Sequence, residues 1–98
     1  MTRVFEVKNK NGKLIYLTNE RYEHIKKHPE MRNPDILAVI EQTIRNPHTV
    51  RGYSLDPNIW YYYSYHKDRK SKARYLRIIV KYLNGEGFVI TAYFVTNI

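Results

Sequence analysis

The sequence predicts an α+β domain in which two helices pack against one face of a largely antiparallel sheet. Three observations lead to this prediction: an Asn-Gly turn between two short apolar segments, two helical patterns that each end near a proline, and four alternating strand segments in the second half. The chain has 98 residues, which suits a single domain, residues 1–98, with one modest core. Any functional site must therefore share its surface with that core.

The first expected element is a β-hairpin around Asn11-Gly12. The segments RVFEVK and KLIYL flank NKNG, and Asn-Gly is the strongest short-range hairpin signal. This interpretation places four residues on one face of the hairpin: Phe5, Val7, Leu14 and Tyr16.

A first helix is expected over TNERYEHIKKH, with Thr18 as its cap and an end near Pro29. Thr18, Tyr22 and Ile25 share one side of this helix. A second helix is indicated by Asn33 as cap and Pro34 at the first helical position, and it runs through DILAVIEQTIR to Asn46-Pro47. Its apolar stripe consists of Ile36, Val39, Ile40 and Ile44.

Four strands are expected in the remainder: HTVRGYS, IWYYYSYHK, RYLRIIVKYL and FVITAYFVT. The last turn, NGEG, admits two registers. A two-residue Asn-Gly turn pairs Leu83 with Glu86, whereas a type I turn with a left-handed Gly87 pairs Asn84 with Phe88. We expect the second register, because it sorts apolar and polar residues onto separate faces.

Under this register the core face carries Ile78, Val80, Tyr82, Ile90, Ala92 and Phe94. The other face carries Arg77, Ile79, Lys81, Thr91, Tyr93 and Val95, with Lys81 opposite Thr91.

Positive charge is the strongest compositional feature. Seventeen Lys and Arg against nine Asp and Glu give a net charge of +8, which attracts nucleic acid, anionic membranes or acidic proteins. No apolar run approaches the roughly 20 residues needed to span a bilayer, and MTRVFEVK lacks the long apolar region of a signal peptide. We therefore expect no membrane association and a cytoplasmic location. The absence of Cys excludes disulfides and thiolate zinc sites.

The segment IWYYYSYHK carries rings on both faces, one of which is expected to be core. It leads into KDRKSKAR, and seven Lys and Arg from Lys67 to Lys81 meet one acid, Asp68. Rings beside cations are typical of single-stranded nucleic acid binding, and exposed bases favour RNA. The predicted binding residues are Arg51, Tyr61, Tyr62, Tyr63, Lys67, Arg69, Lys70, Lys72, Arg74 and Arg77. Half-buried strand tyrosines beside a solvated loop are the alternative interpretation.

The carboxylates are too scattered for a nuclease metal site. Asp35 begins a helix, and the other acids lie in turns or apart from one another, whereas metal-dependent nucleases need converging carboxylates. We expect neither metal nor cofactor. RNA offers another route, because its 2′-OH can attack the neighbouring phosphate when proton-transfer groups and cations assist.

Two histidines in ERYEHIKKHPEM are the candidate proton-transfer residues. His24 and His28 are four residues apart and share one side if the helix persists. This spacing also suits zinc, but the zincin pattern needs Glu directly after the first His, where this chain has Ile25. A surface or capping role is the alternative for each, and His48 and His66 are interpreted as structural.

Several segments together resemble a known nuclease family. LTNERYEHIKKHPEM, the helix ending in IRNP, HTVRG, and the strands LRIIVKYL and FVITAYFVT resemble the phage-associated branch of the barnase, EndoU, colicin and RelE-like nucleases, the BECR fold. The resemblance covers residues 14–96 in order. It implies a curved sheet and metal-independent RNA cleavage by the toxin of a toxin–antitoxin or phage-conflict system. An acidic antitoxin or immunity protein is then the expected partner.

The resemblance also implies the site residues. His24, His28, Lys81, Thr91 and Tyr93 fall on the family's polar motif positions, and Arg51 follows the second helix, where a phosphate-binding cation could lie.

Our interpretation is a metal-independent endoribonuclease in which His24 leads proton transfer with His28 or Tyr93 as its partner. Lys81 and Arg51 would bind phosphate, and Thr91 would donate a hydrogen bond. Two alternatives stay open: a non-catalytic RNA- or DNA-binding module, and a RelE- or ParE-like toxin that acts on a protein target.

Overall fold

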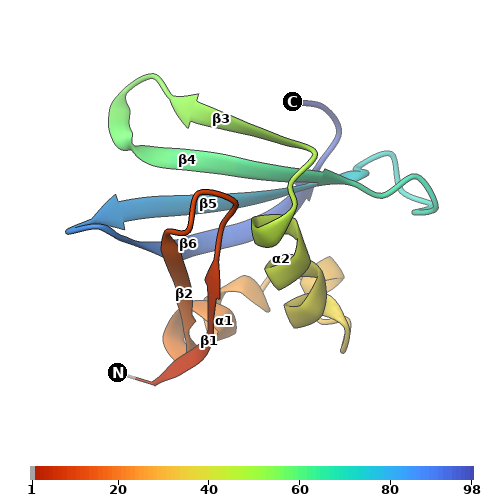
Figure 1. Ribbon diagram of the computed structural model, residues 1–98. Coiled ribbons are helices and arrows are strands. Elements are labelled where there is room, and N and C mark those ends of the chain that lie inside the picture. Colours follow the sequence, from red (N-terminus) through yellow and green to blue (C-terminus); the bar gives the residue numbers. More distant parts are fainter. Residues whose placement is uncertain (1) are drawn as a thin grey trace.

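A computed structural model describes residues 2–98 and confirms the α+β class. The six strands form one sheet in the order β1-β2-β6-β5-β4-β3, and every neighbouring pair is antiparallel except β2 and β6. The strands are β1 (Arg3–Lys8), β2 (Leu14–Thr18), β3 (Thr49–Tyr53), β4 (Asp56–Tyr65), β5 (Tyr75–Leu83) and β6 (Glu86–Val95). The helices are α1 (Asn19–Ile25), the 3₁₀ helix η1 (Pro29–Met31) and α2 (Ile36–Arg45). Figure 1 shows α1 and α2 on the same side of the curved sheet.

The β1–β2 hairpin forms around Asn11-Gly12 as predicted, but the inward residues of β2 differ. The buried apolar residues of the hairpin are Phe5 and Val7 in β1, and Ile15 and Leu17 in β2. The prediction that Leu14 and Tyr16 face inward was therefore wrong by one residue. The cause lies in the turn, where Gly12 has a left-handed φ of 81° and adds a residue to the loop. A shift of one residue exchanges the two faces of a strand.

Helix α1 begins at the predicted cap but ends early. The Thr18 hydroxyl accepts a hydrogen bond from the Arg21 backbone N–H at 3.2 Å, which satisfies a free donor of the first turn. The helix ends at Ile25, and His28 is extended because it precedes a proline. His24 and His28 therefore do not share one side of a helix, contrary to the prediction.

Helix α2 begins later than predicted, because Pro34 lies in a turn rather than in the first helical turn. The Asn33 side chain nevertheless accepts the Asp35 backbone N–H at 2.8 Å and orders this entry. The apolar stripe is confirmed: Ile36, Ile40 and Ile44 are buried, and Val39 packs against them. Within residues 2–98, neither helix has the length and apolar character needed to cross a membrane.

The β5–β6 turn adopts the register that we did not expect. Asn84 and Gly85 have φ values of 54° and 85°, as a two-residue type I′ turn requires, and Leu83 pairs with Glu86. A β-bulge then shifts the register between Ile79 and Val80. Beyond the bulge, apolar and polar side chains again lie on separate faces of the sheet. The two-residue turn is therefore compatible with a buried apolar face.

This register changes two predicted positions. Val80 pairs with Val89, so Val89 rather than Ile90 is buried in the core. Lys81 pairs with Phe88 rather than with Thr91. The other predicted core positions are confirmed: Ile78, Val80, Tyr82, Ala92 and Phe94.

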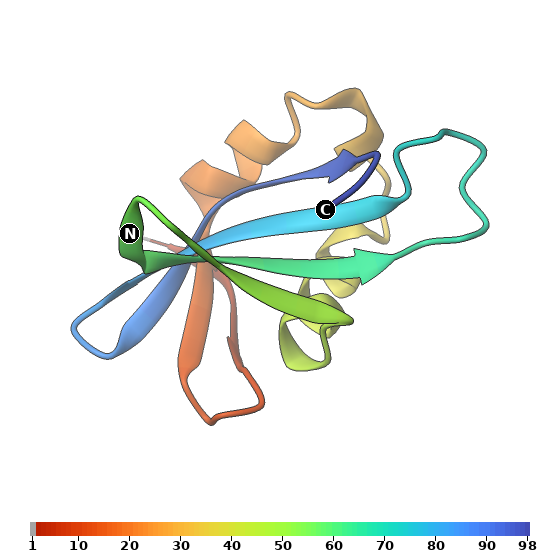
Figure 2. The same cartoon turned by 90° about the horizontal axis from the view of Figure 1, so that it is seen from above.

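The core lies between the helices and the face of the sheet that includes Tyr62 and Ile78. We call the opposite face of strands β3–β6 the helix-free face; Figure 2 views the molecule from this side, with the strands in front of α2. Strand β2 pairs with β6 only at Gly87 and Phe88. Helices α1 and η1 also contact β6, and His28, which lies between these helices, places its ring against Tyr93 of β6.

Candidate active site on the helix-free face

Arg77 of β5 connects three tyrosines on the helix-free face. Its Nε donates to the Tyr63 hydroxyl at 3.0 Å, and its Nη1 donates to the Tyr93 hydroxyl at 3.3 Å. The guanidinium carbon lies 5.1, 5.5 and 5.8 Å from the ring centroids of Tyr61, Tyr63 and Tyr93. We call the set Arg77, Tyr61, Tyr63, Tyr93 and His28 the Arg77 cluster.

No carboxylate of the described residues compensates the charge of Arg77. Arg77 takes part in none of the ion pairs formed within residues 2–98. Burial lowers the pKa of Arg77, but hydrogen bonds to Tyr93 and Tyr63 outweigh this effect and raise the pKa above its usual value. These bonds occupy Nε and Nη1, so Nη2 can still donate to an anion such as phosphate.

His28 reaches the cluster from the edge of the sheet. Its ring centroid lies 5.5 Å from that of Tyr93, and its side chain is half-buried. No side-chain hydrogen bond within residues 2–98 occupies its imidazole. The ring is therefore a candidate to hydrogen-bond a bound molecule.

His24, the predicted leading residue, has a different setting. It is exposed in the last turn of α1. Within residues 2–98, no hydrogen bond, ion pair or ring contact joins its side chain to the Arg77 cluster. The structure therefore brings His28, rather than His24, to Tyr93.

Lys81 and Thr91 lie on the helix-free face with Tyr93, as predicted, but both are constrained. The Lys81 Nζ lies 3.7 Å from Asp56 Oδ2, so a carboxylate partly compensates its charge. The Thr91 hydroxyl oxygen is buried and has no hydrogen-bond partner among residues 2–98. A buried hydroxyl cannot donate to a phosphate at the surface, so the predicted role of Thr91 does not fit this geometry.

Of the three tyrosines predicted to stack on bases, only Tyr61 fits that role. Tyr62 is 4% exposed and faces the core, and Tyr63 is 2% exposed. These two predictions were wrong, because a buried ring has no free face for a base. Tyr61 instead stacks on Tyr53, with centroids 5.8 Å apart and planes at 22°, and Tyr53 is 37% exposed. Arg51 is exposed and pairs with Tyr61 across the strands, which adds a cation beside this ring.

The loop between β4 and β5 carries the other predicted cations. Its exposed lysines are Lys67, Lys70 and Lys72. Arg69 donates to the Ala73 carbonyl at 3.0 Å and lies over the Phe94 ring at 3.7 Å. Arg74 donates to the Ser71 carbonyl at 3.1 Å. The two arginines therefore hold the loop in shape, while the lysines remain available for phosphates.

Ser64 and His66 form a close polar pair that the sequence did not indicate. The Ser64 hydroxyl lies 2.8 Å from His66 Nε2 and 2.8 Å from the Thr43 hydroxyl, which donates to the Val39 carbonyl. Because Thr43 uses its proton on Val39, Ser64 donates to Thr43 and accepts from His66. His66 is then not a base for Ser64, which agrees with the structural role predicted for it. His48 Nδ1 similarly accepts a backbone N–H of β4 at 2.7 Å.

Metal ligands do not converge in the described part of the chain. Among residues 2–98, no group of three or more His, Cys, Asp or Glu side chains could hold a metal ion.

Comparison with known proteins adds no relative. No protein-family model, curated protein or solved structure matches the chain.

Proposed function

We propose that the protein is an endoribonuclease that cleaves RNA without a metal ion, and that the Arg77 cluster is its active site. The observation that supports this most strongly is Arg77 itself. Its guanidinium has no carboxylate partner among residues 2–98, is held by the hydroxyls of Tyr63 and Tyr93, and lies on the face that His28 reaches. A fixed cation beside a free imidazole is the combination that RNA transesterification needs.

The proposed reaction is attack of the 2′-oxygen on the neighbouring phosphorus. The bond from phosphorus to the 5′-oxygen breaks, which leaves a 2′,3′-cyclic phosphate and a 5′-hydroxyl. Arg77 Nη2 would donate to the non-bridging oxygens, where negative charge increases in the transition state. His28 would transfer a proton, either from the 2′-OH or to the 5′-oxygen. The Tyr93 hydroxyl accepts from Arg77, so its own proton could serve the leaving oxygen or the phosphate.

The surroundings of the cluster support RNA as the substrate. Tyr53 and Tyr61 offer a stacked aromatic surface beside Arg51. The exposed lysines of the β4–β5 loop and a net charge of +8 favour a polyanion. The resemblance to BECR-fold nucleases extends the proposal to a toxin acting in the cytoplasm, with an acidic antitoxin or immunity protein covering these cations.

The proposal predicts cleavage of single-stranded RNA in excess EDTA, with 2′,3′-cyclic phosphate ends. His28→Ala should reduce the single-turnover rate about 100-fold or more, the scale expected for one general acid–base group. Arg77→Lys should also reduce it strongly, because an ammonium ion cannot reproduce the fork of a guanidinium. His24→Ala is the matched control and should cleave at close to the wild-type rate.

Each other outcome has a definite meaning. Intact RNA that is still bound tightly would support a non-catalytic binding module. Toxicity without RNA binding would point to a protein target, as for RelE- or ParE-like toxins. Cleavage that requires Mg²⁺ would contradict the mechanism, and loss of activity in His24→Ala alone would move the site to α1.

A further inference from the structure

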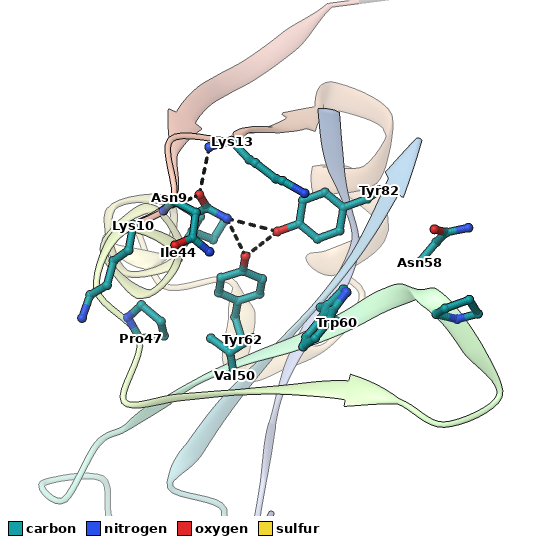
Figure 3. A pocket seen from close by; sticks show the side chains of 12 residues that line it. Asn9, Lys10, Lys13, Ile44, Pro47, Val50, Asn58, Trp60, Tyr62 and Tyr82 are labelled. Carbon is teal, nitrogen blue, oxygen red and sulfur yellow. Dashed lines mark hydrogen bonds between the residues drawn. The ribbon is translucent and has the colours of Figure 1, made fainter. Parts of the chain in front are cut away.

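A cavity of about 500 Å³ lies on the side of the sheet opposite the Arg77 cluster. Trp60 and Tyr62 line it, and they alternate along β4 with Tyr61 and Tyr63, which face the other way. Figure 3 shows the cavity between the β1–β2 turn and strands β3–β5. Its size falls in the usual range for small-molecule sites. We call it the Trp60 cavity.

Asn9 organises the polar wall of the cavity. Its Oδ1 accepts the backbone N–H groups of Asn11 at 3.0 Å and Lys13 at 2.9 Å. Its Nδ2 donates to the hydroxyls of Tyr62 at 3.0 Å and Tyr82 at 3.3 Å, and Figure 3 shows these bonds. Because Oδ1 faces two backbone donors, the orientation of the amide follows from the network.

In the described part of the chain, residues 2–98, the hydroxyls of Tyr62 and Tyr82 leave one proton without an acceptor. They also hydrogen-bond each other, and that bond uses the proton of only one hydroxyl. The hydroxyl that accepts in this bond keeps its own proton. Asn9 cannot accept that proton, because its Nδ2 is a donor to both hydroxyls. Burial and the bond to Tyr62 raise the pKa of Tyr82, so its hydroxyl stays protonated at neutral pH. The cavity therefore presents one O–H donor.

An aromatic ring and a cation lie beside this donor. Trp60 is 39% exposed, and a Cβ at Gly52 would lie 3.4 Å from its indole ring, so Gly52 allows the ring to pack on β3. Lys13 Nζ lies 5.3 Å from the centroid of the Tyr82 ring. A planar ring with a hydrogen-bond acceptor and a negative group complements all three features.

We propose that the Trp60 cavity binds a nucleotide whose base carries an exocyclic carbonyl, such as uracil. The base would stack on Trp60, its carbonyl oxygen would accept the unpaired tyrosine proton, and its phosphate would lie near Lys13. This site is separate from the Arg77 cluster, because the two lie on opposite faces of the sheet.

Tryptophan fluorescence tests the proposal directly, because Trp60 is the single Trp of the chain. Uridine and uridine monophosphate should each quench it in a saturable way. Asn9→Asp is the decisive variant. One carboxylate oxygen would still accept the backbone N–H groups of Asn11 and Lys13, and the other would accept the free tyrosine proton. Neutral uridine should then bind about tenfold more weakly or worse, the scale of one unmade hydrogen bond in a buried site. Thermal unfolding should show that the variant is folded.

Two further variants separate the contributions. Lys13→Gln should weaken binding of uridine monophosphate but not of uridine. Added salt should likewise weaken binding of the monophosphate only, because it screens the charge of the phosphate. His28→Ala should leave nucleotide binding unchanged while RNA cleavage falls, which separates this site from the proposed active site. The proposal is overturned if neither probe quenches saturably, if inorganic phosphate alone quenches equally, or if folded Asn9→Asp binds uridine as wild type does.

Discussion

At the scale of single residues, hydrogen-bond partners decide what each polar group can do. Ser64 lies beside a histidine, but the bond from Thr43 to Val39 directs the Ser64 proton away from His66. Arg77 contacts hydroxyls rather than carboxylates, so its charge and Nη2 remain available. Proximity to His66 alone would suggest that Ser64 is a nucleophile. The directions of the hydrogen bonds exclude His66 as its base and favour the site around Arg77.

His66 should make stability depend on pH. Burial, followed by the nearby charges of Arg69 and His48, lowers the pKa of His66 in the folded chain. As pH falls below about 6.5, the usual histidine pKa, the unfolded chain binds a proton that folded His66 resists. The free energy of unfolding should therefore decrease as pH falls from about 6.5 through the lowered folded pKa.

Urea denaturation at pH 7.5 and 5.5 measures this effect. His66→Gln keeps a donor for Ser64 but cannot titrate, so it should reduce the loss of stability in acid. His24→Gln, at an exposed position, should keep the wild-type dependence. An unchanged dependence in His66→Gln would assign the effect to another group.

At the scale of elements, turns and bulges determine which residues meet. In the β1–β2 turn, Gly12 shifts the inward face of β2 by one residue. In the β5–β6 hairpin, Asn84-Gly85 forms the tight turn, and the bulge between Ile79 and Val80 corrects the register afterwards. The Asn-Gly turn thus keeps its preferred conformation and the apolar side chains are buried. The bulge leaves one residue of β6, between Val89 and Thr91, without a partner in β5.

The tight turn predicts a specific effect of Gly85→Ala. Gly85 has φ of 85°, and a Cβ there would meet no atom within 4 Å, so the cost arises from the backbone alone. The free energy of unfolding should fall by about 1–2 kcal/mol, the cost of the left-handed conformation for an L-residue. Asn84→Gly is the control and should change stability little. Chemical denaturation of both variants measures this, and equal stability of Gly85→Ala would contradict the two-residue turn.

At the scale of the whole molecule, the β4–β5 loop adds exposed cations to a sheet that carries exposed rings. The lysines of the β4–β5 loop extend from the sheet that carries Tyr61 and Arg51. Five acids outside this loop pair with cations: Glu6, Glu23, Glu41, Asp56 and Glu86. RNA binding should therefore depend on salt through the loop and on base stacking through the tyrosines.

The slope of log affinity against log salt concentration separates these contributions. Replacing Lys67, Lys70 and Lys72 with Gln should reduce the slope by about 2, the value for three contacts to single-stranded nucleic acid. Tyr53→Ala should weaken binding but keep the slope, because stacking releases no counterions. Lys8→Gln with Arg45→Gln, at two exposed positions away from the loop, serves as the control for net charge. A slope that falls equally in the control would contradict a localised phosphate path.

The sequence by itself determined what depends on neighbours along the chain. The Thr18 cap, the apolar stripe of α2, the hairpin at Asn11-Gly12 and the order of the elements along the chain all follow from patterns a few residues long. These patterns suffice for the α+β class. Local patterns also indicated Arg77 and His28 as functional candidates, whereas Tyr93 was implied only by the resemblance to BECR-fold nucleases.

Only the tertiary structure decided which of these candidates lie together. His28 meets Tyr93 because β2 leaves part of β6 to η1. Asn9, which no motif indicated, meets Tyr62 and Tyr82 because of the hairpin turn. The physical reason is that residues far apart in sequence meet according to register and packing. A single left-handed glycine or bulge changes the register, and with it the side of the sheet that each side chain occupies.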